Sequence, residues 1–478
     1  MDYKLLAIQV LWSFMEQFLR KASLTIITIT LALILTPADF GRIALALTVA
    51  TIGNCIIDGG LKQSLIKQDI NEKNLNASFI INIILGVSIF TTQYMAAPII
   101  ADIYNDKELA GIIQTTAWGA IIYAFQPVSS SILTKKMQFG KLMKISFPSV
   151  ILSGSTAIVM AHNGYGINAL TTQYLVGLTS SSILLTIASD WKPKLRFDKK
   201  SIVKMLSCSR GFFITNILEV SFQNIYILTI SKVSGAHLTG CFFFANKIKE
   251  AILGQLITSI QTVYFSASSL FKDDKNKLKL DTHEILVVTN FCSTPILILS
   301  IYLCAPFFVY ALSSSWSPAG EYLKIILFGS ILFPAHIANL NLLKLLGTAR
   351  QLIITDAIKK TFASLALIIT YKLGVTFILW GYASVSILAF FINAMHSKEL
   401  INYSIKDQIL DLLPPYLICA ISMIILFIMM HNTTIYSISY FVVSTTIFTV
   451  SYIGLSHLLN KNQTHIFLNF IKKIKGRK

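Results

Sequence analysis

Long apolar runs alternate with short polar turns along nearly the whole chain of 478 residues. A helix needs about 20 apolar residues to cross the hydrocarbon core of a bilayer. The fold class expected from this pattern is an all-α polytopic membrane protein with about 14 transmembrane helices. Their expected ranges are 6–35, 42–65, 77–101, 109–133, 143–162, 166–189, 204–231, 238–270, 284–312, 320–346, 351–372, 375–396, 411–431 and 435–459.

Two runs contain no Asp, Glu, Lys or Arg and are too long for one span each, residues 145–189 and 412–460. A polar stretch interrupts each run near its middle, HNGYG at His162–Gly166 and HNTTIY at His431–Tyr436. Polar and glycine-rich breaks of this kind are typical of turns. Each run therefore predicts two helices joined by a tight turn.

The corner LTPADFG lies between the first two expected helices. Pro37 is expected to end the first helix, because a proline ring cannot continue the hydrogen-bond ladder. Asp39 is expected to cap the second helix, near residue 42. This places the corner on the side of the membrane opposite to the N-terminus.

Composition excludes a soluble protein. Hydrophobic residues make up 54% and charged residues 13% of the chain, whereas soluble domains carry about 25% charged residues. The net charge of +18 comes mainly from turns on one side of the predicted membrane. The turns predicted on the opposite side contain four Lys or Arg residues, Arg42, Lys107, Lys232 and Lys372. By the positive-inside rule both termini are expected in the cytoplasm, and no nucleic-acid partner is expected.

An internal repeat divides the predicted helices. Ala97-Pro98 matches Ala305-Pro306 (305 − 97 = 208), and Gly41 in ADFGR matches Gly240 in HLTGC at a similar offset. The pattern predicts two pseudo-symmetric six-helix lobes of the same orientation, followed by two extra C-terminal helices. The predicted domains are an N-lobe at 1–191, a cytoplasmic basic linker at 192–203, a C-lobe at 204–400, two helices at 401–460 and a basic cytoplasmic tail at 461–478.

The six cysteines and eight histidines show no spacing typical of a metal site or a disulfide framework. No outer turn is long enough for the catalytic loop of a membrane polymerase or ligase, and no catalytic motif stands out. The sequence therefore predicts neither a cofactor nor a metal, and a protein that is not an enzyme.

Three segments carry a resemblance to a known family. They are LALILTPADFGRIALALTV, DGGLKQSLIKQ at Asp58–Gln68 and APIIADIYNDKEL at Ala97–Leu109. They resemble the Wzx-type polysaccharide and O-antigen flippases, in particular the colanic-acid-exporter-like branch, of the multidrug/oligosaccharidyl-lipid/polysaccharide exporter superfamily. The resemblance implies two lobes around a central cavity and transport by alternating access. Leu33 stands where the family usually has an arginine.

Charged residues inside membrane helices are costly and usually face a cavity or a partner. We expect Arg20, Lys21, Arg210 and Lys247 to form a basic cavity that binds the diphosphate of a lipid-linked glycan, since guanidinium groups suit phosphate oxygens. The alternative for Arg20 is a structural pair with Glu16, four residues away. Lys249 and Glu250 are expected to pair with each other or to extend to the interface.

Three acids are candidates for H⁺ or Na⁺ coupling, Glu16, Asp58 and Glu219. Glu219 is the most isolated in sequence, although a salt bridge to Arg210 or a lysine is an equal alternative. Asp58 precedes Gly59 and Gly60, which could form a hinge. The alternative for Asp58 is a place at the cytoplasmic interface.

The resemblance implies a flippase that moves undecaprenyl-diphosphate-linked oligosaccharide repeat units across a bacterial inner membrane. Expected partners are this substrate, membrane lipids and other polysaccharide-assembly proteins. A MATE-like drug/cation antiporter of the same superfamily is the first alternative, although its cavity would be richer in acids. A membrane polysaccharide polymerase or ligase is a third function class, and one that the short outer turns disfavour.

Overall fold

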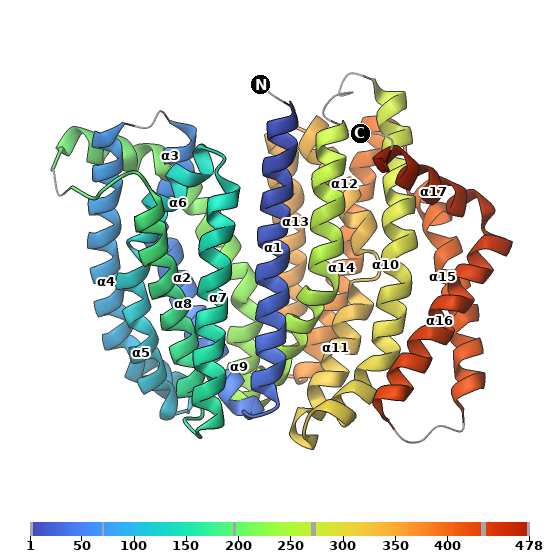
Figure 1. Cartoon of the computed structure of the whole chain (residues 1–478), viewed down its shortest axis with the longest axis horizontal. Coiled ribbons are helices and arrows are strands. Elements are labelled where there is room, and N and C mark those ends of the chain that lie inside the picture. Colours follow the sequence, from blue (N-terminus) through green and yellow to red (C-terminus); the bar gives the residue numbers. More distant parts are fainter. Residues whose placement is uncertain (1–2, 69–70, 195–196, 269–273, 432–435, 476–478) are drawn as a thin grey trace. The chain divides into compact units, whose positions relative to one another are not determined.

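The computed structural model describes residues 3–68, 71–194, 197–268, 274–431 and 436–475. Helices are the regular elements of these residues (Figure 1). From the N-terminus they are α1 (Tyr3–Ala32), α2 (Pro37–Asp58), α3 (Leu61–Lys67), α4 (Glu72–Tyr104), α5 (Glu108–Tyr123), α6 (Gln126–Lys135), α7 (Phe139–His162), α8 (Asn168–Ala188) and α9 (Lys199–Ser268). They continue with α10 (Lys275–Ala311), the 3₁₀ turn η2 (Ser314–Trp316), α11 (Ser317–Gly329), α12 (Phe333–Leu346), α13 (Ala349–Thr370), α14 (Val375–Ile401), α15 (Ile405–Met430), α16 (Ile438–Leu459) and α17 (Lys461–Lys475).

The predicted all-α membrane fold is confirmed. Each of the expected spans falls on one helix, on a pair of consecutive helices or on one part of α9. Within the described residues, nine helices are long and apolar enough to cross a membrane, or ten if the bent pair α11–α12 counts as one span. The predicted total of 14 is consistent with this arrangement.

Helix α9 joins two predicted spans. Its 70 residues contain one non-helical position, Gly235, with φ 74° and ψ −176°. At a rise of about 1.5 Å per residue, an unbroken helix of that length would be several times longer than the hydrocarbon core is thick. Glycine adopts this positive φ without the steric penalty of a Cβ. Gly235 therefore separates the predicted spans 204–231 and 238–270.

Two predicted spans are broken rather than continuous. The span predicted at 109–133 divides into α5 and α6, and the span predicted at 320–346 divides into α11 and α12, with a bend of 47° in the second pair. Pro127 and Pro334 lie in the first turn of α6 and α12, where a missing backbone N–H is tolerated. The two prolines are 334 − 127 = 207 residues apart, close to the offset of the sequence repeat.

The corner after α1 forms an N-cap. Thr36 caps α2, with its side chain accepting from the Asp39 backbone N–H while the Asp39 carboxylate accepts from the Thr36 backbone N–H at 3.0 Å. Pro37 is the first residue of α2 rather than the stop of α1. The helix thus begins five residues before the predicted start at 42, because the corner itself supplies the capping box.

The chain forms two compact units, Met1–Phe244 and Ala245–Lys478. In the first unit, α7 packs on α1 and α8, and α5 packs on α2, α4 and α8. In the second, α14 packs on α11, α12 and α13, and α10 packs on α11, α15 and α17. The lobe boundaries expected from the repeat, 1–191 and 204–400, stay a prediction.

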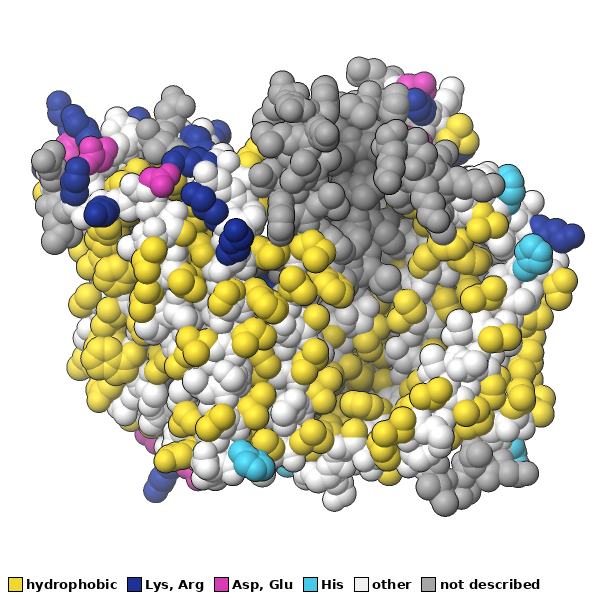
Figure 2. Space-filling view, in the orientation of Figure 1, with side chains coloured by type: hydrophobic (Ala, Val, Ile, Leu, Met, Phe, Trp, Pro, Cys, Tyr) yellow, Lys and Arg dark blue, Asp and Glu magenta, His cyan; other side chains and the backbone are white. Residues whose placement is uncertain are grey.

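The basic linker predicted at 192–203 is tied to the first unit. Lys194 Nζ lies 2.6 Å from Glu72 Oε1 at the start of α4, and Lys136 Nζ lies 3.0 Å from Asp190 Oδ2 just before the linker. The hydrogen bond and charge of Lys136 lower the pKa of Asp190. In Figure 2, most visible Lys and Arg side chains of this unit gather at the end formed by α3 and α6.

Candidate functional site

Helix α2 runs along α9 within the first unit and contacts it at three levels. Near its start, a Cβ placed on Gly41 would lie 1.8 Å from the Ala236 carbonyl oxygen. A Cβ placed on Gly240 would lie 1.7 Å from the Pro37 carbonyl oxygen. Such distances are far below van der Waals contact, so both positions require glycine. The two glycines matched by the sequence repeat thus contact each other's helices.

The middle and the far end of α2 contact the part of α9 before Gly235. Thr48 Oγ1 lies 3.3 Å from Asn224 Oδ1. At the far end, a Cβ on Gly60 would lie 2.6 Å from Phe212 Cβ and 2.8 Å from the Ser209 carbonyl oxygen. Helix α2 therefore lies against both parts of α9, and its end reaches the helical turn that carries Arg210.

Asp58 lies at the junction between α2 and α3. Gly59 and Gly60 follow it with φ values of 52° and 74°, which turn the chain into α3. The Asp58 residue is buried, with 8% of its surface exposed, and its Oδ1 has no hydrogen-bond partner. A buried carboxylate oxygen without a partner is costly and could be satisfied by a proton or a monovalent cation.

Arg20 and Lys21 lie near the middle of α1. Arg20 is 17 residues from the first residue of the helix and 12 from the last (20 − 3 and 32 − 20), or about 26 Å and about 18 Å along the axis. Both side chains are half-buried, whereas Arg210 on α9 is exposed. These three predicted cations belong to the first unit, and Lys247 belongs to the second.

Glu250 pairs with Lys247 rather than with Lys249, the partner expected from the sequence. Lys247 Nζ lies 3.3 Å from Glu250 Oε2, and both side chains are about half exposed. Lys249 instead contacts Tyr382, with Nζ 3.4 Å from the hydroxyl oxygen and 5.7 Å from the ring centroid. Residues three apart share a helix face, whereas adjacent residues point in different directions.

The acids predicted for ion coupling are in different surroundings. Glu219 is exposed on α9, and its Oε1 accepts a hydrogen bond from Gln223 Nε2 at 2.9 Å. Its proposed role in ion coupling, and the alternative salt bridge to Arg210 or a lysine, stay predictions. The side chain of Glu16 lies outside the described residues, so its predicted pair with Arg20 stays a prediction.

The sequence did not predict a role for several uncharged polar residues inside the first unit. Asn54 Nδ2 donates to the Tyr174 hydroxyl at 3.3 Å, and Gln126 Nε2 donates to Ser182 Oγ at 2.9 Å. Asn82 on α4 is fully buried, and neither of its side-chain polar atoms has a partner. Amide side chains within apolar runs are the signal that could have located these buried polar residues.

Comparison with known proteins identifies the family. The family described as polysaccharide biosynthesis protein matches residues 30–321, more than half of the chain. The lipopolysaccharide biosynthesis protein WzxC of Escherichia coli (strain K12) is 22% identical over 278 residues, which cover 56% of this chain and 55% of WzxC. The teichuronic acid biosynthesis protein TuaB of Bacillus subtilis (strain 168) is 23% identical over 382 residues, 78% of each chain.

Solved structures share the fold. The lipid II flippase MurJ in an inward closed conformation matches with a TM-score of 0.77 and 16% identity, over 95% of this chain and 99% of MurJ. An inward-facing multidrug resistance MATE family transporter of the MOP superfamily matches with a TM-score of 0.58 and 14% identity, over 80% of this chain and 96% of the transporter. The two solved structures are named as a flippase and a transporter, and they show the fold that this chain shares. The chain is a multi-pass membrane protein that belongs to the polysaccharide biosynthesis protein family, as its resemblance to Wzx-type flippases implied.

Proposed function

We propose that the protein is a flippase that moves undecaprenyl-diphosphate-linked oligosaccharide repeat units from the cytoplasmic to the periplasmic leaflet by alternating access. The observation that carries the proposal is the place of Arg20 and Lys21 near the middle of α1, the helix of the first predicted span, in a member of this family. Fixed cations at that depth are costly and usually face a partner or a water-filled cavity, where an anionic substrate can bind. The diphosphate is such a group, and it must cross the bilayer with the glycan.

Arg20, Lys21, Arg210 and Lys247 are the proposed diphosphate ligands. A guanidinium group donates two parallel hydrogen bonds to phosphate oxygens, and the cations offset the loss of hydration of the diphosphate. The pair between Lys247 and Glu250 at 3.3 Å is about half exposed, and exposed pairs contribute at most about 1 kcal/mol. Lys247 can therefore leave Glu250 and contact a phosphate oxygen at a small cost in free energy.

Asp58, Glu219 and Glu16 are the proposed groups for H⁺ or Na⁺ coupling. Asp58 is the strongest of these because it is buried and its Oδ1 has no hydrogen-bond partner. Its junction lies against the turn of α9 that carries Arg210, through Gly60. Protonation of Asp58, or binding of a cation to it, would then change the charge next to the part of α9 that carries Arg210.

The proposed location is the bacterial inner membrane, with both termini in the cytoplasm. The gathering of Lys and Arg at the α3 and α6 end of the first unit supports this orientation through the positive-inside rule (Figure 2). Other polysaccharide-assembly proteins would supply the substrate and receive it.

The proposal is tested by complementation of surface glycan in the native host. The triple variant Arg20→Gln, Arg210→Gln, Lys247→Gln keeps side-chain length and hydrogen-bonding ability but removes three charges. We expect it to lose surface glycan, whereas Arg350→Gln, which removes an exposed cation in the first turn of α13, leaves it unchanged. Normal surface glycan in the triple variant, at equal membrane levels, would overturn the basic-cavity mechanism. Export of a cationic dye by the wild type, with no effect on glycan, would favour the drug/cation antiporter.

A further inference from the structure

A cavity of about 720 Å³ lies in the second unit, and none of the proposed transport residues lines it. It is open to the surface and is bordered by the first part of α10, the first part of α15 and the start of α17. Its polar lining includes His283, Asp411, Asn460, Lys461, Asn462 and His465. All of these side chains lie in the described part of the chain.

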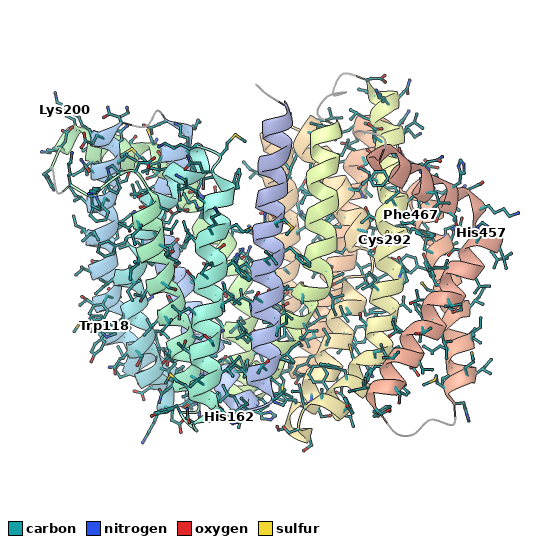
Figure 3. All side chains as sticks on the ribbon, viewed as in Figure 1. Trp118, His162, Lys200, Cys292, His457 and Phe467 are labelled. Carbon is teal, nitrogen blue, oxygen red and sulfur yellow. The ribbon has the colours of Figure 1, made fainter. Side chains whose placement is uncertain are left out.

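The cavity wall is held in place by contacts of α17. Gln463 Nε2 donates to the Asp411 carbonyl oxygen at 2.8 Å, and Asn460 Nδ2 donates to Gln463 Oε1 at 2.9 Å. Phe467 packs on Phe291 of α10 with ring centroids 5.1 Å apart. Figure 3 labels Phe467 on α17 and Cys292, the neighbour of Phe291, on α10. A buried amide and an aromatic pair thus fix α17 against α10 and α15, so the cavity is a built part of the unit.

Opposite charges face each other across this cavity. On one wall, His283 Nδ1 lies 2.8 Å from Asp411 Oδ2, and the Tyr403 hydroxyl donates to the same oxygen. On the other wall, Lys461 and His465 are exposed at the start of α17. Lysine and imidazolium groups suit a phosphate, and a carboxylate suits an ammonium group. The lining is therefore complementary to a small group that carries both charges.

The position of the cavity favours a lipid over a soluble ligand. Asp411 and Asn460 border the uncharged run 412–460, so the cavity lies where apolar segments meet polar ones. Helix α17 is strongly amphipathic, with Ile466 and Phe467 among its apolar residues and four lysines among its polar ones. Such helices lie at the level of the lipid headgroups. In Figure 2, histidine and lysine side chains are visible at this end of the second unit.

We propose that this cavity binds the headgroup of an aminophospholipid as a resident lipid of the protein. The phosphate contacts Lys461 and His465, and the primary ammonium contacts Asp411. A choline headgroup has no N–H to donate to the carboxylate, and a glycerol headgroup has no cation. This site is separate from the transport residues, so its test does not depend on the flippase proposal.

The test measures lipid binding to the purified full-length protein by native mass spectrometry. The probes are dioleoyl phosphatidylethanolamine, phosphatidylglycerol and phosphatidylcholine, with soluble phosphoethanolamine as the chain-free counterpart. We expect phosphatidylethanolamine to bind about tenfold more tightly than the other two lipids, as for one charge-assisted hydrogen bond. Phosphoethanolamine is expected not to compete at equal concentration.

Single substitutions test which residues contact the phosphate and which contact the ammonium group of the headgroup. Lys461→Ala is expected to weaken phosphatidylethanolamine binding about tenfold, and Asp411→Asn to remove the preference over phosphatidylglycerol. Lys406→Ala, which removes an exposed lysine of α15 outside the cavity, serves as the matched control. Thermal unfolding midpoints measured without added lipid identify any variant that misfolds. If Lys461→Ala misfolds, His465→Ala replaces it as the variant of the phosphate end. Equal binding of the three lipids, equal effects of Lys461→Ala and Lys406→Ala, or full competition by phosphoethanolamine would overturn the proposal.

Discussion

Gly41 and Gly240 show how single residues set a helix crossing. Each would place a Cβ within 2 Å of a carbonyl oxygen of the other helix, at 1.8 Å and 1.7 Å. Beside them, the rings of Phe40 and Phe244 pack edge to face with centroids 6.0 Å apart. The close approach and the aromatic pair together hold the start of α2 against α9.

We predict that Gly41→Ala destabilises the protein. The added methyl group must push α2 away from α9, and overpacking of this kind costs about 1–3 kcal/mol. The thermal unfolding midpoint of the purified protein measures the effect. Gly111→Ala is the matched control, because nothing lies within 4 Å of a Cβ there, and it should be neutral or stabilising by up to about 1 kcal/mol. Equal midpoints for the two variants would contradict the crossing.

Residue pairing could be predicted from the sequence only in part. The charged side chains of the spans were identifiable, because each interrupts an apolar run. Their partners were not, since Lys247 reaches Glu250 across one helical turn while Lys249 reaches Tyr382 on another helix. The contact of Asn54 with Tyr174 could not be predicted either, because the two residues come from two helices far apart in the sequence.

The N-cap of α2 is a local element that the sequence encodes completely. Thr36 and Asp39 form a reciprocal capping box, and Pro37 occupies the first turn. Arg42 follows in the second turn, with its Nε 2.7 Å from Asp106 Oδ2, which connects α2 to the residues just before α5. The cap and the ion pair explain why the corner residues belong to α2.

We predict that Thr36→Ala lowers the unfolding free energy by about 1 kcal/mol, the usual effect of losing an N-cap side chain. Chemical or thermal unfolding of the purified variant measures the loss. Thr51→Ala is the control, because the Thr51 hydroxyl only bonds to the Leu47 carbonyl within the same helix at 2.7 Å. A larger effect at Thr51 than at Thr36 would show that the cap is not formed.

Helix positions were predictable to within a few residues for most spans, whereas the internal breaks were not. The apolar run continues through Ala124 and Phe125 between α5 and α6, and through Ile331 and Leu332 between α11 and α12. Hydropathy therefore carries no sign of these breaks. Pro127 and Pro334 mark the positions of the breaks. A proline is compatible both with the first turn of a new helix and with a kink in a continuous helix, so the sequence does not distinguish the two.

At the scale of the whole molecule, the two units repeat one order of elements. A long helix containing Pro98 or Pro306 precedes a broken pair in each, followed by two further long helices. The sequence repeat predicted this order, since it depends on offsets alone. Packing between α2 and α9 could not be predicted, because the offset pairs Gly41 with Gly240 as equivalents and says nothing of contact.

The proposed orientation predicts which turns can be labelled from outside. In a chain whose native cysteines are replaced, Asn163→Cys in the turn after α7 should react with a membrane-impermeant maleimide in intact cells. Lys406→Cys in the first turn of α15 should react only after the membrane is opened. Both positions are exposed, so access to the reagent decides the result. The reverse labelling pattern would contradict cytoplasmic termini.

The central claim is that Arg20 and Lys21, near the middle of α1, help to carry an anionic lipid-linked glycan across the bilayer. Its most direct test is the rate at which purified protein in vesicles moves an undecaprenyl-diphosphate-linked oligosaccharide to the opposite leaflet. The wild type should accelerate this movement, Arg20→Gln should slow it at least about tenfold, as for one lost charge-assisted hydrogen bond, and Arg350→Gln should leave it unchanged. Equal rates with wild type, Arg20→Gln and protein-free vesicles would contradict the claim.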